Sequence, residues 1–164
     1  MMGLDQYGLD INWYFTDESN NVCVATSAGG TLPTPVIENY EINEQFDKIV
    51  NELPKKFKVI TNKNVFKLIQ GITDENLYFE SFKDLASRGL YVFDKLNLDD
   101  PENGEYLLVA YPDYNMNINK CPVDTEIISL IPNIKHPVIL RLEQTILNES
   151  FTPIDLIKIL NNIN

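Results

Sequence analysis

Residues 74–88 constrain the fold most narrowly, because this stretch carries a helix start, a periodic apolar face and a helix stop. Asp74 is of the type that accepts the first free N–H groups of a helix, and Gly89 stands where a left-handed C-terminal residue is favoured. Asp84 and Arg88 are four residues apart and would pair on the helix surface. Three apolar residues share one face at helical spacing: Tyr78, Phe82 and Leu85. The sequence therefore predicts an amphipathic helix here.

An opening β-hairpin is predicted from two runs of strand-forming residues separated by a polar turn. Residues 9–16, LDINWYFT, and residues 22–30, VCVATSAGG, are rich in aromatic and β-branched types. The five residues between them, DESNN, are typical of turns. The pair Gly29-Gly30 and the prolines at 33 and 35 should then take the chain out of the sheet.

A second antiparallel pair is predicted in the middle of the chain. Residues 90–94, LYVFD, and residues 106–112, YLLVAYP, have the composition of strands. The connection between them, LNLDDPENGE at 96–105, is acidic and rich in turn-forming residues. We therefore expect an exposed acidic loop between two paired strands.

The remaining segments predict shorter elements. Residues 39–53 repeat apolar side chains at helical spacing, and residues 56–61 and 137–145 alternate as strands do. Residues 125–132, TEIISLIP, fit either a strand or one or two helical turns. Thr152-Pro153 has the pattern of a cap and a first-turn proline, which predicts a short C-terminal helix.

These elements together predict an α+β fold over residues 1–164, as one domain without internal repeats. Hairpins interspersed with helices favour an antiparallel or mixed sheet with about three helices packed on it. At 164 residues and 44% hydrophobic residues, the chain has the material for one sizeable core.

The net charge and the number of cysteines limit the classes of partner that the protein could bind and the cellular compartment in which we expect it. Thirteen Lys and Arg against 24 Asp and Glu give a formal net charge of −11, which disfavours nucleic acid and anionic lipid. A basic protein is the complementary partner, although solubility alone would also explain the charge. Cys23 and Cys121 form neither a disulfide framework nor a zinc pattern. No signal-like N-terminus and no apolar run of about 18 residues is present, so we expect a cytoplasmic protein without a membrane span.

No motif in the chain specifies a catalytic activity. His136 is the only histidine and has no recognisable nucleophile near it, so a structural role is favoured. The Gly-rich stretch 27–31 could cradle an anion, but it lacks the phosphate-binding patterns and fits a turn better. We therefore expect no enzyme and neither a cofactor nor a metal ion.

Four acids in the predicted loop and two nearby tyrosines are the candidate contact residues for a partner: Asp99, Asp100, Glu102, Glu105, Tyr111 and Tyr114. The acids do not have the spacing of a calcium-binding loop, and Pro101 interrupts them. A solvated loop is the simpler interpretation of these acids, and an acidic contact surface for a basic protein is the functional one.

Aromatic residues allow the same two interpretations. Trp13, Tyr14 and Phe15 are consecutive and would point to both faces of a sheet. Core packing is the default role for them, as it is for Tyr111 and Tyr114. An exposed member could instead anchor an interface, where aromatic side chains are enriched.

Two stretches carry a resemblance to known proteins. The opening GLDINWYFTDESNNV with the Gly-Gly loop after it, and LASRGLYVFD in the middle, resemble small uncharacterised bacterial proteins that include immunity proteins of toxin systems. The resemblance implies a non-enzymatic protein that neutralises a basic toxin by occluding its active site. The alternative is an intracellular domain that binds a small molecule, or serves as a scaffold or a subunit of a homo-oligomer.

Overall fold

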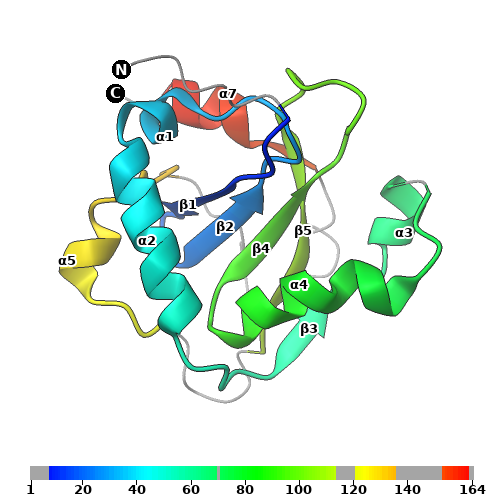
Figure 1. The fold of residues 1–164 in the computed structure, drawn as a ribbon, viewed down its shortest axis with the longest axis horizontal. Helices are drawn as coiled ribbons and strands as arrows, with labels where there is room; N and C mark the ends of the chain where they lie inside the picture. The colour runs from blue at the N-terminus through cyan, green and yellow to red at the C-terminus, as the bar shows by residue number, and fades with distance from the viewer. Residues whose placement is uncertain (1–7, 70, 114–120, 136–152, 163–164) are drawn as a thin grey trace.

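A mixed sheet forms the centre of the protein in the computed structural model, which describes residues 8–69, 71–113, 121–135 and 153–162 (Figure 1). The sheet has the order β1-β2-β4-β5-β3, and β6 also pairs with β5. Its strands are β1 (Asn12–Thr16), β2 (Val22–Thr26), β3 (Val59–Thr61), β4 (Tyr91–Lys95), β5 (Glu105–Pro112) and β6 (Ile154–Asp155). Only the β2–β4 pair is parallel among these pairings, so both predicted hairpins are confirmed and the sheet is mixed.

Six helices accompany the sheet in the described part of the chain, more than the three that the sequence predicted. They are α1 (Thr34–Glu38), α2 (Tyr40–Glu52), α3 (Val65–Leu68), α4 (Glu75–Ser87), α5 (Thr125–Ile128) and α7 (Leu156–Asn161). The two unexpected ones, α1 and α3, and α5, which lies in the ambiguous segment, span only four or five residues, too few to show a helical period. The ambiguous segment 125–132 thus contains a helical turn.

Helices cover both faces of the sheet, which explains the three consecutive aromatic residues of β1. Tyr14 packs in a cluster under α2 and α4, whereas Trp13 and Phe15 lie in the opposite cluster, with side chains of α1 and α7. All three rings are fully buried. The core interpretation of these residues is therefore confirmed.

The helix α4 forms as the sequence predicts. The Asp74 carboxylate accepts a hydrogen bond from the Leu77 N–H at 3.1 Å, and Gly89 adopts a left-handed φ of +101°. Arg88 pairs with Asp84 at 3.2 Å. The Arg88 guanidinium also donates to the carbonyl of Asn51 at 3.1 Å, at the C-terminal end of α2. One side chain thus ends α4 and ties it to α2.

Two buried asparagines complete the backbone pairing at the edges of the sheet. Asn43 of α2 accepts from the Tyr14 N–H and donates to the Asn12 carbonyl, both at 3.0 Å, and so replaces a missing strand beside β1. Asn62 donates to the Leu108 carbonyl through its side chain and to the Val109 carbonyl through its backbone, both at 2.8 Å. Exposed strand edges invite unwanted pairing, and these amides cover them.

The C-terminal helix begins later than the sequence predicted. Asp155 is the N-cap of α7 and accepts from the Lys158 N–H at 3.0 Å. The prediction of Pro153 in the first turn is wrong, because Ile154 and Asp155 pair with β5 as β6 and require extended backbone. The predicted cap Thr152 and the predicted strand at 137–145 lie outside the described residues. Within the described ranges, no helix is long and apolar enough to cross a membrane.

Candidate functional site

The acidic loop, residues 96–105, connects β4 to β5 and ends on the first residue of β5. It holds the four predicted contact acids, all of them exposed: Asp99, Asp100, Glu102 and Glu105. Three short-range hydrogen bonds fix its shape. The side chains of Asn97, Asp100 and Asn103 each accept, at 3.0 Å, from the backbone N–H two residues further on. Such Asx turns give a loop a defined backbone path. The structure therefore presents these carboxylates from one ordered loop.

A buried lysine lies beneath the acidic loop. Lys95 is only 1% exposed, and its ammonium group donates to the Asn103 carbonyl. Burial lowers the pKa of Lys95, and the charges of Asp100, Asp155 and Glu102 act in the opposite direction. A Cβ atom on Gly30 would lie 2.9 Å from Lys95 Cε and 3.0 Å from the Pro101 carbonyl oxygen, so this turn packs closely on the Lys95 side chain. Lys95 thus joins the acidic loop to the turn after β2.

That turn, residues 27–30, is not arranged to bind an anion. The Ala28 N–H donates to a carboxylate oxygen of Asp10 at 3.0 Å, and the Gly30 N–H donates to the Ser27 carbonyl at 2.8 Å. An anion cradle would need these N–H groups free. The interpretation of the Gly-rich stretch as a turn is the one that these hydrogen bonds support.

The exposed apolar side chain of the acidic loop is a leucine instead of a tyrosine. Leu98, within the loop, is 59% exposed. Tyr111 is 4% exposed and stacks on Tyr91 with ring centroids 6.2 Å apart, so it cannot contact a partner on this surface. The other predicted anchor, Tyr114, lies outside the described residues.

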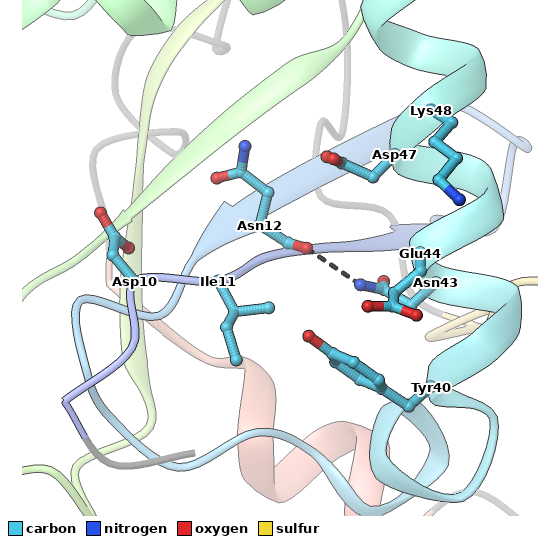
Figure 2. A pocket seen from close by; sticks show the side chains of 8 residues that line it. All are labelled: Asp10, Ile11, Asn12, Tyr40, Asn43, Glu44, Asp47 and Lys48. Atoms are coloured by element: carbon cyan, nitrogen blue, oxygen red, sulfur yellow. Dashed lines mark hydrogen bonds between the residues drawn. The ribbon is translucent and has the colours of Figure 1, made fainter. Parts of the chain in front are cut away.

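A groove between α2 and the start of β1 is a second candidate site, which sequence reasoning missed. We call it the α2 groove, and its volume is about 300 Å³. Figure 2 shows the side chains that line it: Asp10, Ile11, Asn12, Tyr40, Asn43, Glu44, Asp47 and Lys48. A usable signal existed in α2, because Tyr40, Glu44 and Asp47 recur at helical spacing and so share one polar face.

Hydrogen bonds hold the inner wall of the α2 groove in place. The Tyr14 hydroxyl donates to one oxygen of Asp47, and the Asn51 side-chain amide donates to the other at 3.2 Å. Burial raises the pKa of the Tyr14 hydroxyl, and the nearby Asp47 carboxylate raises it further. Burial also raises the pKa of Tyr40, with the charges of Glu44 and Asp47 acting in the same direction. The groove is therefore a site of negative potential.

A row of polar residues crosses the sheet from the floor of the α2 groove. Asn12, Thr26 and Asp94 are in register on β1, β2 and β4. The Thr26 hydroxyl donates to Asp94 at 3.1 Å, and the Tyr78 hydroxyl donates to it at 2.7 Å. Burial raises the pKa of Asp94, and these hydrogen bonds oppose the shift. The end of an otherwise apolar sheet face is thus polar and acidic.

Histidine and cysteine give no further site. His136 lies outside the described residues, and Cys23 and Cys121 are both buried and free of disulfide bonds. Across the ranges that the structure describes, no group of three or more His, Cys, Asp or Glu residues could hold a metal ion.

Comparison with known proteins adds no relative from which residues could be transferred. No protein-family model, no curated protein and no solved structure matches this chain. The acidic loop and the α2 groove are therefore the features on which a functional conclusion rests.

Proposed function

We propose that this protein is a non-enzymatic binding protein of the immunity type, which neutralises a basic toxin by covering its active site. The observation that carries the proposal is the acidic loop, where four exposed carboxylates and the exposed Leu98 lie on a fixed backbone. The resemblance of the GLDINWYF and LASRGLYVFD stretches to immunity proteins points in the same direction.

The protein would bind the toxin through its negative charge and through the fixed shape of the acidic loop. A net charge of −11 steers a basic protein toward this one and speeds their encounter. The carboxylates then meet the Lys and Arg side chains with which the toxin holds nucleic acid, and Leu98 supplies an apolar contact. Because Asx turns and Lys95 fix the loop beforehand, binding loses less conformational entropy than it would with a disordered loop.

The alternative of a small-molecule pocket has less support. Ligand pockets are mostly apolar with a few polar groups, whereas the α2 groove is lined by Ile11, Tyr40 and six further residues that are all polar or charged. Two free cysteines are consistent with a reducing cytoplasm, which is where a toxin that acts on nucleic acid would have to be neutralised.

The experiment that tests the proposal compares two variants that each lose four negative charges. The loop variant carries Asp99→Asn, Asp100→Asn, Glu102→Gln and Glu105→Gln, and keeps the Asx acceptor of residue 100. The control variant changes four exposed acids outside the acidic loop: Glu18, Glu52, Glu80 and Glu126, each to Gln. Both are used with the wild-type protein as bait in cell extract of the native host at low and at high salt.

One basic protein should be captured by the wild type and the control, released as salt rises, and lost with the loop variant. Its enzymatic activity, measured with the purified protein, should be inhibited by the wild type at a near-equal molar ratio. Equal capture by the loop variant and the control, or capture without inhibition, would contradict the proposal.

A further inference from the structure

We propose that the α2 groove binds the guanidinium group of an arginine side chain of the basic partner. The source of that arginine rests on the proposed function, but the recognition chemistry rests on the groove alone. The charge of the groove, the order of its walls, and the match between its acceptors and the donors of a guanidinium all favour this ligand.

Three carboxylates and one cation line the groove: Asp10, Glu44 and Asp47 on one hand, and Lys48 on the other. In the described part of the chain, ion pairs within 4.0 Å join Asp84 to Lys55 and to Arg88, and none joins a groove carboxylate to a cation. A cation entering the groove therefore meets an excess of negative charge, since one ammonium group stands against three carboxylates.

The acceptors of the groove are held in place before any ligand arrives. Asp10 is fixed by the Ala28 N–H, and Asp47 by the Tyr14 hydroxyl and the Asn51 amide. Asn43, which is 5% exposed, locks α2 onto β1 at a fixed distance. A pre-organised set of acceptors binds more tightly, because less freedom is lost on binding.

Arginine fits this arrangement better than lysine does. Figure 2 shows acceptors on both sides of the groove, with Asp10 and Asn12 on the β1 side and Glu44 and Asp47 on α2. A guanidinium group has five donors in a planar fork and can bond to several acceptors at once, whereas an ammonium group is a compact point charge. The half-buried Tyr40 ring offers a surface on which a guanidinium can stack.

The size of the cavity agrees with a single side chain as the occupant. At about 300 Å³ the groove lies at the lower end of the range for pockets that take drug-sized ligands. An arginine that projects from a folded partner would fill it, while the acidic loop contacts the surrounding basic surface.

The test uses the isotope-labelled full-length protein and three blocked pentapeptides, Gly-Gly-Xaa-Gly-Gly, in which Xaa is arginine, lysine or citrulline. Citrulline has nearly the shape of arginine but no charge. Backbone amide shifts are followed by NMR during titration. The arginine peptide should shift the amides of residues 10–12 and 40–48 in a saturable manner, the lysine peptide should bind more weakly, and the citrulline peptide should not bind.

Three variants of α2 separate the groove from general attraction to an acidic protein. Glu44→Gln should weaken the arginine peptide about fivefold, which is the factor for two unit charges about 4 Å apart in water. Lys48→Gln should strengthen its binding, since it removes the one cation of the lining. Glu41→Gln, an equal loss of charge at an exposed position of α2 outside the lining, should change the affinity less than twofold.

Equal shifts with citrulline, or equal weakening by Glu44→Gln and Glu41→Gln, would overturn this inference. That failure would leave the proposed function intact if a basic partner is still captured through the acidic loop. Conversely, specific binding of the arginine peptide without capture of a basic partner would support guanidinium binding by the α2 groove and would reject the proposed immunity function.

Discussion

Replacement of Asn43 by leucine should cost about 2–4 kcal/mol of stability, because it removes both hydrogen bonds that cover the edge of β1. The Tyr14 N–H and the Asn12 carbonyl would each lose a partner that now lies at 3.0 Å. A buried backbone group without a partner costs about 1–3 kcal/mol. Two such groups would cost about 2–6 kcal/mol together. We expect the lower part of this range, because Asn12 is only half-buried and water can reach its carbonyl in part.

Asn43→Asp removes only one of the two hydrogen bonds that Asn43→Leu removes. Aspartate keeps an acceptor for the Tyr14 N–H but cannot donate to the Asn12 carbonyl at neutral pH. It should therefore destabilise the protein as well. Asn51→Leu is the matched control, because Asn51 lies two turns further along α2 and is exposed. It should change the stability by less than about 0.5 kcal/mol.

Urea unfolding measures these differences, with the fluorescence of Trp13 and far-UV circular dichroism as two probes. Trp13 is the single tryptophan and is fully buried, so its emission reports the loss of the core. The midpoint should fall at constant slope, and the melting temperature should fall by about 5–15 °C. If Asn43→Leu were as stable as the Asn51→Leu control, Asn43 would not cover the strand edge and the reasoning would be refuted.

Three further predictions concern other contacts of the fold. Arg88→Lys should cost about 1–3 kcal/mol in urea unfolding, because lysine lacks the fork that reaches the carbonyls of α2, and unchanged stability would exclude this capping role. Gly89→Ala should cost at least about 1 kcal/mol in the same assay, because Gly89 has a φ of +101° and a Cβ atom there would lie 2.9 Å from the Phe57 ring. Unchanged stability of this variant would contradict that geometry. Burial raises the pKa of Asp94, so the folded state binds this proton more tightly than the unfolded chain, and stability falls as pH rises from about 4 through the raised pKa. Asp94→Asn should remove that loss, and a stability difference between variant and wild type that does not change with pH would contradict the assignment.

Features that depend on neighbours in the sequence were predictable. The helix α4 forms as expected because its cap, its apolar face and its terminal glycine all lie within 16 residues, from Asp74 to Gly89. The two hairpins follow from strand-forming runs that are separated by stretches rich in turn-forming residues. The acidic loop and its exposure follow in the same way, since Asx turns link residues two positions apart.

Features that depend on which segments meet were not predictable from one sequence. The start of α7 after Asp155 is set by β6, because the pairing of Ile154 and Asp155 with β5 excludes the earlier helix start that the local pattern favoured. For Tyr111 the sequence favoured the core but left a role as a surface anchor open, and the stacking of its ring on Tyr91, 20 residues away in the chain, decides for the core.

The sequence by itself determined the acidic charge, the α+β class and the elements whose signals are local, because capping, periodicity and turn formation act over a few residues. Only the tertiary structure decided that β2 and β4 run parallel, that Asn43 covers the edge of β1, and that Asp10 lines the α2 groove together with Glu44 and Asp47. These arrangements join residues about 30 to 70 positions apart, and their partners are chosen by the packing of the whole core on both faces of the sheet.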